Sequence, residues 1–124
     1  MSFLVVRAYL KLISFESCLR RRDFVALWNK VHSYPLSTQA GTPAEIQRIC
    51  SAIDLACVWY WKQAHCLQRS AATACLLRKY GAKAQVVIAC RPMPFQAHAW
   101  VEVEGRVVND TPDVQETYVV LERC

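Results

Sequence analysis

The sequence predicts a single α+β domain over residues 1–124, with a helical N-terminal half packed on an antiparallel sheet. Apolar residues recur at helical spacing in the first part of the chain, and the pattern changes to that of strands after Gly81. Helices that precede strands, instead of alternating with them, favour the α+β class over the α/β class. The 124 residues, 54% of them hydrophobic, are enough to form one domain with a core.

Composition and charge exclude several classes of protein. The net charge of +5 is modest, and basic and aromatic residues do not interleave, so we expect no nucleic-acid partner. No apolar stretch approaches the ~18 residues of a membrane span, and Arg7 and Lys11 interrupt the apolar start, which argues against a signal peptide. We therefore expect a cytoplasmic protein without a membrane partner, whose seven cysteines stay reduced.

Two helices are predicted in the N-terminal segment, residues 1–42. Apolar residues at helical spacing mark them: Phe3, Val6, Leu10 and Ile13, then Phe24, Leu27, Trp28 and Val31. Residues 33–43 contain Ser, Pro, Thr and Gly without any periodicity, so they are predicted to form a loop.

A strong helix start opens the core region, residues 43–124. Thr42 can cap the helix, Pro43 suits its first position, and Glu45 completes a capping box. The helix is expected to continue to about Trp61, because apolar residues recur at helical spacing up to that point.

A second core helix is expected from His65–Cys66 to Tyr80. Gly81 follows it, and glycine can adopt the left-handed conformation that ends many helices. The side chains of residues 70–75 are small on nearly every side, which lets neighbouring elements approach closely. We therefore expect this helix to be buried on most of its faces.

Four strands are predicted after Gly81: Ala84–Cys90, Ala97–Val103, Val107–Asp110 and Thr117–Glu122. The first is a continuous apolar run, and the second alternates between two faces. Arg91–Phe95 contains two prolines and is predicted to be a loop.

The turn between the second and third strands decides whether His98 faces Asp110. A three-residue turn at 103–105, with a left-handed glycine at its third position, pairs Glu102 with Arg106 and His98 with Asp110. A two-residue turn would instead point Asp110 away from His98. We predict the three-residue turn, because it satisfies the opposite charges and a His–Asp hydrogen bond together.

Cys66, His98 and Asp110 form a candidate catalytic triad. Thiol catalysis needs a thiolate nucleophile, a base that exchanges protons with it, and a group that orients the base. A helix N-terminus favours a thiolate, and its free N–H groups can hold an oxyanion. Cys66 is the cysteine that we expect at such a position. A lone histidine on a strand is more often structural, so the catalytic interpretation depends on the predicted strand register.

The segments Cys66–Ser70 and Ala97–Glu102, followed by Asp110, resemble the transglutaminase-like cysteine-peptidase superfamily. They are most similar to the stand-alone leader peptidases of lasso-peptide biosynthesis, and the resemblance covers roughly residues 57–124. It implies a transglutaminase-like or papain-like core in which the cysteine, histidine and aspartate are the nucleophile, the base and the orienting acid.

The resemblance also implies a substrate and partners. The substrate is a ribosomally made lasso-peptide precursor, from which the enzyme removes the leader. In such systems a separate leader-binding protein delivers the precursor, and a separate ATP-dependent lasso cyclase closes the released core peptide. No cofactor or metal is expected, and the chain contains neither a Cys-x-x-Cys pair nor a glycine-rich phosphate loop.

Five further residues are candidates for binding the substrate: Trp61, Gln63, Arg69, Phe95 and Trp100. Gln63 could donate to the oxyanion, or be an ordinary exposed residue at a helix end. Arg69 could bind a carboxylate or carbonyl of the peptide, although a structural ion pair is the commoner role. Trp61 and Phe95 could line a cleft, with core packing as the alternative for Trp61. Trp100 could shield the His–Asp hydrogen bond from water.

Two other functions remain open. An acyltransferase or transglutaminase would use the same three residues, with an amine in place of water. A non-catalytic peptide-binding domain would instead keep Cys66 buried and unreactive. The reactivity of Cys66 and the mass of the reaction product distinguish these alternatives from a peptidase.

Overall fold

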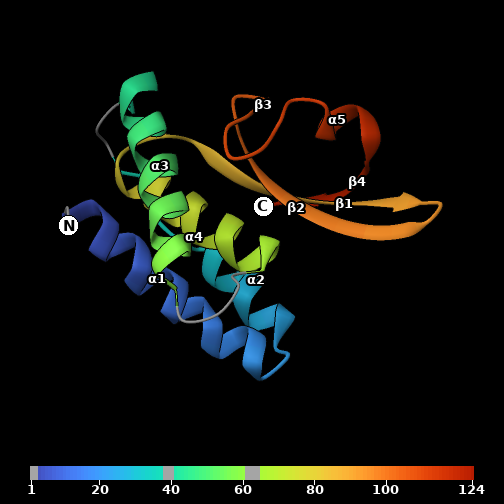
Figure 1. Ribbon diagram of the computed structural model, residues 1–124, viewed down its shortest axis with the longest axis horizontal. Coiled ribbons are helices and arrows are strands. Elements are labelled where there is room, and N and C mark those ends of the chain that lie inside the picture. Colours follow the sequence, from blue (N-terminus) through green and yellow to red (C-terminus); the bar gives the residue numbers. More distant parts are fainter. Residues whose placement is uncertain (1–2, 38–40, 61–64) are drawn as a thin grey trace.

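The structure is a computed structural model that describes residues 3–37, 41–60 and 65–124. Helices come first along the chain: α1 (Phe3–Arg20), α2 (Phe24–His32), α3 (Pro43–Trp59) and α4 (Cys66–Lys79). The strands follow: β1 (Ala84–Pro92), β2 (Phe95–Val103), β3 (Arg106–Val107) and β4 (Val119–Arg123), with the short helix α5 (Val114–Thr117) before β4. Figure 1 shows the four long helices gathered beside the sheet, from which the β1–β2 hairpin projects. The predicted α+β class is confirmed.

The sheet has the order β3-β2-β1-β4, and every neighbouring pair of strands is antiparallel. β1 and β2 remain paired out to Pro92 and Phe95, so the connection is a turn at Met93–Pro94 and the longer loop predicted at Arg91–Phe95 is wrong. β4 pairs with β1 only as far as Cys90. Pro92 therefore lies at the outer end of the hairpin, where its missing N–H interrupts no central ladder.

The second hairpin turns through Glu104–Gly105 alone, because Val103 pairs with Arg106. Both turn residues have positive φ angles, 53° and 77°, which match a two-residue turn of type I′. The predicted three-residue turn is therefore wrong. The strand predicted to continue to Asp110 is also wrong, since β3 ends at Val107.

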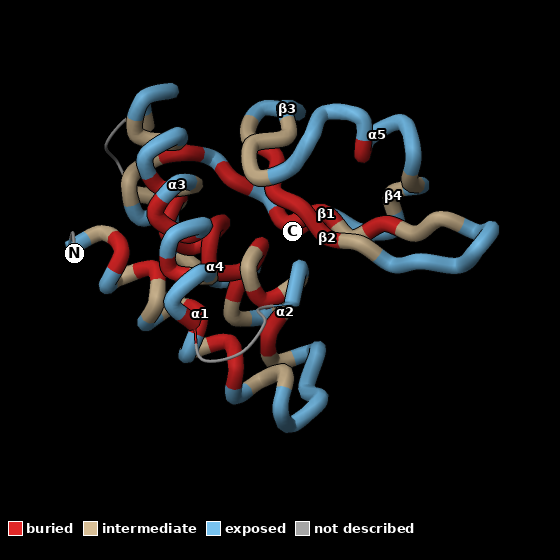
Figure 2. The backbone as a smooth tube through the Cα atoms, viewed as in Figure 1, coloured by how far each residue is buried: buried red, intermediate tan, exposed pale blue. Residues whose placement is uncertain are grey.

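α4 is the central helix of the fold. It is buried from Ser70 to Leu77, as its small side chains predicted, and it packs against the other three long helices and against β1 and β2. Figure 2 shows that buried residues are concentrated in α4, along α1 and in the middle of the sheet. Because α4 is covered along its length, the position of its first residue is determined by the core.

The apolar repeat used to predict α1 lies on the exposed side of that helix. The side chains of this repeat are 40–70% exposed: Phe3, Val6, Leu10 and Ile13. A second apolar series faces the core instead: Val5, Ala8, Leu12 and Phe15. Apolar side chains therefore occupy two sides of α1, and spacing alone could not identify the buried one. Neither α1 nor any other helix in the described ranges has the length and hydropathy needed to cross a membrane.

The second face of the sheet carries a smaller apolar cluster of its own. Its buried members are Val87, Ala89, Trp100 and Val114, with Tyr118 packed at the margin. The chain from β3 through α5 covers this face. The strand predicted at Thr117–Glu122 is displaced to Val119–Arg123, because residues 114–117 form α5.

The start of α3 is packed tightly against the end of α4. The Thr42 side chain accepts a hydrogen bond from the Glu45 N–H at 3.2 Å, as the capping signal predicted. The Gly41 N–H donates to the Gly81 carbonyl at 3.3 Å. A Cβ atom at Gly41 would lie 2.8 Å from the Ala82 nitrogen, closer than such contacts occur, so the backbone would have to move.

We expect Gly41→Ala to lower the free energy of unfolding by ~1–3 kcal/mol, because the added methyl group meets backbone that cannot rotate away. Urea denaturation followed by circular dichroism measures the change. Ser51→Ala, at an exposed position of α3, is the control and should alter stability by no more than ~0.5 kcal/mol. Equal effects of the two substitutions would contradict the packing argument.

Candidate active site

Cys66 is the first residue of α4, and its side chain is exposed. The preceding residue, His65, has an extended backbone and makes no side-chain hydrogen bond to the helix end. The first N–H groups of α4 are therefore not capped by that side chain, and a helix N-terminus favours negative charge nearby. Two predicted neighbours of this position, Trp61 and Gln63, lie outside the described residues.

His98 and Asp110 are in direct contact. His98 Nε2 donates to Asp110 Oδ2 at 2.6 Å, and the two side chains are 24% and 29% exposed. The other carboxylate oxygen, Oδ1, accepts from the Thr111 N–H at 2.8 Å. Both oxygens of Asp110 are therefore engaged. The contact places the ring hydrogen of neutral His98 on Nε2 and leaves Nδ1 free to accept a proton.

Asp110 contacts His98 even though the observed strand register, with its two-residue turn, was expected to point Asp110 away from His98. The Val108 N–H donates to the Val101 carbonyl at 3.0 Å, which continues the ladder for one more bond. The Val101 N–H then donates to the Asn109 side-chain Oδ1 at 2.7 Å, where a strand would offer a backbone carbonyl. The chain leaves the sheet at this point, so the alternation of faces no longer determines where Asp110 points.

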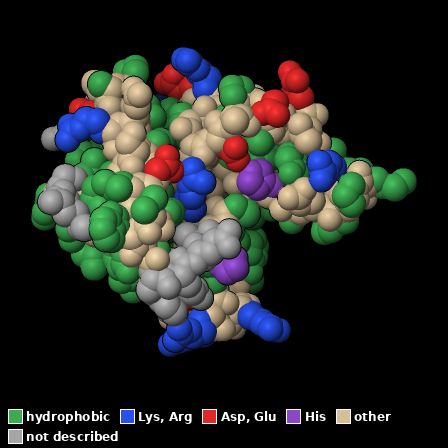
Figure 3. All heavy atoms as spheres, in the orientation of Figure 1, with side chains coloured by type: hydrophobic (Ala, Val, Ile, Leu, Met, Phe, Trp, Pro, Cys, Tyr) green, Lys and Arg blue, Asp and Glu red, His purple; other side chains and the backbone are tan. Residues whose placement is uncertain are grey.

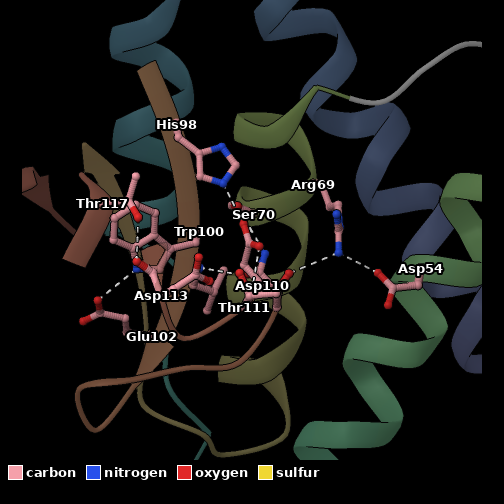
Figure 4. A network of polar contacts seen from close by, with 12 residues as sticks. Asp54, Arg69, Ser70, His98, Trp100, Glu102, Asp110, Thr111, Asp113 and Thr117 are labelled. Atoms are coloured by element: carbon pink, nitrogen blue, oxygen red, sulfur yellow. Dashed lines mark hydrogen bonds and ion pairs between the residues drawn. The ribbon is translucent and has the colours of Figure 1, made fainter. Parts of the chain in front are cut away.

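Asn109 also connects this segment to α4. Its Nδ2 donates to Ser70 Oγ at 3.3 Å, and its backbone carbonyl accepts from Arg69 Nη2 at 3.1 Å. The same Nη2 donates to Asp54 Oδ1 on α3 at 2.8 Å (Figure 4). Arg69 is thus held in an ion pair and a backbone contact, which corresponds to the structural role considered for it.

Cys66 lies one helical turn before Ser70 and on the same side of α4. The two residues are separated by about 6 Å along the helix axis. Because Ser70 contacts the residue that precedes Asp110, the start of α4 and the His98–Asp110 pair belong to one region of the molecule. Among the described residues, no hydrogen bond joins the Cys66 sulfur to the His98 ring. Figure 3 shows histidine, acidic and basic side chains gathered where the helices meet the sheet.

Two aromatic side chains pack against the His98 ring. The ring centroid of Trp100 is 6.0 Å from that of His98, and the centroid of Tyr118 is 5.3 Å from it. Trp100 is completely buried, so in this structure it offers no exposed surface to a substrate. It instead supports the imidazole from the core side. Tyr118 is only partly buried and was not identified from the sequence.

Glu102 holds the Trp100 indole in place from a position that is 3% exposed. Trp100 Nε1 and Gln115 Nε2 both donate to Glu102 Oε2, at 2.9 and 3.0 Å. Burial opposes ionisation of Glu102, but these hydrogen bonds and the nearby Arg123 guanidinium outweigh it and lower the pKa of the carboxyl. Glu102 therefore remains a charged acceptor beneath the candidate site.

Phe95 lies apart from the His98–Asp110 pair. It is 74% exposed and lies at the outer end of β2. Phe95 and His98 are three positions apart on one strand, so their side chains leave opposite faces of the sheet. The structure therefore places Phe95 and His98 on different sides of the sheet, and a wall formed by Phe95 stays a prediction.

All seven cysteines are free thiols, and they differ in their surroundings. Burial, aided for Cys50 by the Asp54 carboxylate, raises the pKa of Cys50 and Cys75 to about 11 each. Burial also raises the pKa of Cys57 and Cys124. Within the described part of the chain, no group of three or more His, Cys, Asp or Glu side chains is placed to hold a metal ion.

Comparison with known proteins identifies the family. The family model described as the transglutaminase-like superfamily matches residues 9–123. The chain belongs to this superfamily. The likeness to it that the sequence motifs indicated is thereby confirmed, and the matched range includes Cys66, His98 and Asp110.

One curated relative of this protein is the microcin J25-processing protein McjB of Escherichia coli. It is 39% identical over 56 residues, which are 45% of this chain and 27% of McjB. The chain thus matches less than a third of that protein's length. A search of solved structures returned no significant match.

Asn109 and Tyr118 are the site residues that sequence reasoning missed. A signal for Asn109 was present, because the run Asn109–Pro112 consists of residue types that end strands and favour turns. Side chains of Asn can replace a backbone group in hydrogen bonding, which is how this strand ends. For Tyr118 the sequence offered no comparable signal, since its contact with His98 depends on the path of residues 108–118.

The lowered pKa of Glu102 makes its contribution to stability depend on pH. The ionised carboxylate stabilises the fold above the ordinary pKa of 4.5, and this contribution is lost as the pH falls through the lower folded-state value. We therefore expect the difference in free energy of unfolding between wild type and Glu102→Gln to shrink as the pH falls to 4.5 and below. Urea titrations at several pH values measure it.

Glu116→Gln removes an exposed carboxylate and serves as the control. Its stability should follow the wild-type pH dependence closely. If the curves of Glu102→Gln and wild type are parallel over the same range, the charged state of Glu102 does not stabilise the fold.

Proposed function

We propose that this protein is a cysteine peptidase that removes the leader from a ribosomally synthesised lasso-peptide precursor. Cys66 is the nucleophile, His98 the general base and acid, and Asp110 the residue that orients His98. The 2.6 Å contact between His98 Nε2 and Asp110, close to the helix that begins at Cys66, is the observation that carries this proposal. Membership of the transglutaminase-like superfamily supports it.

The proposed reaction begins with a Cys66 thiolate and a protonated His98. The thiolate attacks the scissile carbonyl carbon, and the negative charge moves to the carbonyl oxygen, where N–H groups at the start of α4 stabilise it. When the carbonyl re-forms, His98 gives its proton to the leaving amine, which is the new N-terminus of the core peptide. The leader remains bound to Cys66 as a thioester.

Hydrolysis of the thioester completes the cycle. Neutral His98 takes a proton from water at Nδ1, and the resulting hydroxide equivalent attacks the thioester carbon. The C–S bond then breaks, releasing the leader carboxylate and restoring the Cys66 thiolate beside protonated His98. Asp110 holds the hydrogen of Nε2 throughout, so that Nδ1 stays the proton-exchanging atom.

The proposed partners follow from this chemistry. A leader–core precursor is the substrate, and the name of the relative McjB, a microcin J25-processing protein, supports a role in peptide processing. We propose that a separate leader-binding protein presents the precursor, that a separate ATP-dependent lasso cyclase consumes the freed amine, and that the domain acts in the cytoplasm. The core cluster that joins α1 to α4 and the sheet supports action of residues 1–124 as one domain.

Cleavage of a precursor peptide is the direct test. The protein is incubated with a leader–core peptide and its leader-binding partner, and the products are weighed by mass spectrometry. We expect free leader and free core from wild type and no turnover from Cys66→Ala. Asp110→Asn should be slower by about 10²–10⁴-fold, because the ring of His98 loses its orienting charge.

Two outcomes contradict the peptidase. Cleavage by Cys66→Ala at the wild-type rate would remove the nucleophile from the mechanism. A leader product carrying the mass of an added amine, in place of a free carboxylate, would support the acyltransferase alternative.

Selective alkylation tests the non-catalytic alternative. We expect iodoacetamide near neutral pH to modify Cys66 at least about tenfold faster than Cys50 or Cys75, since Cys66 is exposed, whereas Cys50 is half-buried, Cys75 is buried, and both have a raised pKa. Peptide mapping after short reaction times measures each rate. The His98→Ala variant tests whether His98 activates the Cys66 thiol. It should slow modification of Cys66 and leave the rates at Cys50 and Cys75 unchanged. Equal rates at the three cysteines would favour a binding domain without catalysis.

A further inference from the structure

We propose that Asn109 is a positioning residue, which sets the orientation of His98 by fixing the backbone that carries Asp110. The kinetic consequence of this role rests on the proposed peptidase function, whereas the structural consequence does not. In this proposal Asn109 takes no part in the chemistry itself and acts through its neighbour in the chain.

Three polar groups of Asn109 are bound to two different elements. Its Oδ1 accepts from the Val101 N–H on β2 at 2.7 Å. Its Nδ2 donates to Ser70 Oγ on α4 at 3.3 Å, and its carbonyl accepts from Arg69 Nη2 at 3.1 Å. The residue is therefore held to both the strand that carries His98 and the helix that begins at Cys66.

These contacts close a short ring of interactions. From Val101 the ring runs along β2 to His98, across the 2.6 Å hydrogen bond to Asp110, and back through Asn109 to Val101. β3 is only two residues long, so the sheet gives Asp110 no support of its own. Release of the Asn109 side chain would free the carboxylate to move away from the imidazole.

Arg69 supports the same point from the helical side. Its Nη2 bridges the Asn109 carbonyl and the Asp54 carboxylate, which ties α3, α4 and the 109–110 backbone together (Figure 4). Loss of Arg69 would remove this support while leaving both side-chain hydrogen bonds of Asn109 in place. Arg69 and Asn109 therefore offer two separate ways to loosen Asp110.

The tautomer of His98 reports this role without any need for activity. When the contacts from Val101 through Asn109 and Asp110 to His98 are intact, the neutral imidazole carries its hydrogen on Nε2, toward Asp110. When Asp110 is free to move, both tautomers become accessible. The nitrogen chemical shifts of the imidazole in ¹⁵N-labelled protein distinguish the two forms.

The experiment compares wild type, Asn109→Leu and Arg69→Met. We expect both substitutions to shift neutral His98 from the Nε2–H form to a mixture of tautomers. In the cleavage assay kcat should fall by about 10- to 100-fold with a smaller change in KM, because the base is misplaced while peptide contacts remain. If Asn109→Leu does not fold, as judged by circular dichroism, Arg69→Met decides.

Arg78→Met is the matched control. Arg78 is also an arginine of α4 that donates to backbone carbonyls, those of Val31, Ala84 and Cys124, but it lies at the other end of the helix. Its loss should lower stability and leave the tautomer of His98 unchanged.

Two results would overturn the proposal. One is a His98 that keeps its Nε2–H form in folded Asn109→Leu, or, where that variant does not fold, in Arg69→Met. The other is an equal tautomer shift in Arg78→Met, which would make the effect a general consequence of lost stability. If wild type cleaves no precursor, the peptidase proposal fails while the tautomer comparison still decides the role of Asn109.

Discussion

A helix buried along its length but open at its first residue is the constraint on which the rest of the structure depends. α4 is lined with small residues from Ser70 to Cys75, so helices and strands approach it closely from several sides. Such a helix cannot slide or rotate without disrupting packing throughout the core. Cys66 thereby occupies a fixed position at the surface, although its own side chain is exposed.

The candidate site lies at the edge of the sheet, and a separate apolar cluster packs on each face there. The larger cluster fixes α4 on one face of β1 and β2, and the smaller one places Trp100 and Tyr118 on the other face. His98 lies beside the smaller cluster, while Asn109 at the strand edge contacts α4. A small domain can thus position groups from both faces, because β3 pairs with only the last residues of β2 and leaves the rest of that edge open to the 108–110 segment.

Sequence signals predicted local features well and the ends of strands poorly. The cap at Thr42 and the helix start at Cys66 are local, since they depend on neighbouring residue types. The turn at Glu104–Gly105 was ambiguous, because a left-handed glycine fits turns of either length. The hydrogen bond between His98 and Asp110 was predicted, but from a register that the structure does not have. Its true cause, a side chain that replaces a ladder carbonyl, is a tertiary contact that periodicity cannot reveal.

The two supports of His98 differ in physical character, and this difference assigns them different roles. Trp100, whose indole donates to the buried Glu102 carboxylate, restricts the His98 ring through packing and so fixes where the imidazole lies. Asp110 restricts it through one directional hydrogen bond, which selects the nitrogen that carries the hydrogen. Packing alone would leave both tautomers possible, because the imidazole ring has nearly the same shape whichever nitrogen carries the hydrogen. Proton transfer at a single defined atom therefore depends on the polar support, and hence on the residues that hold Asp110 in place.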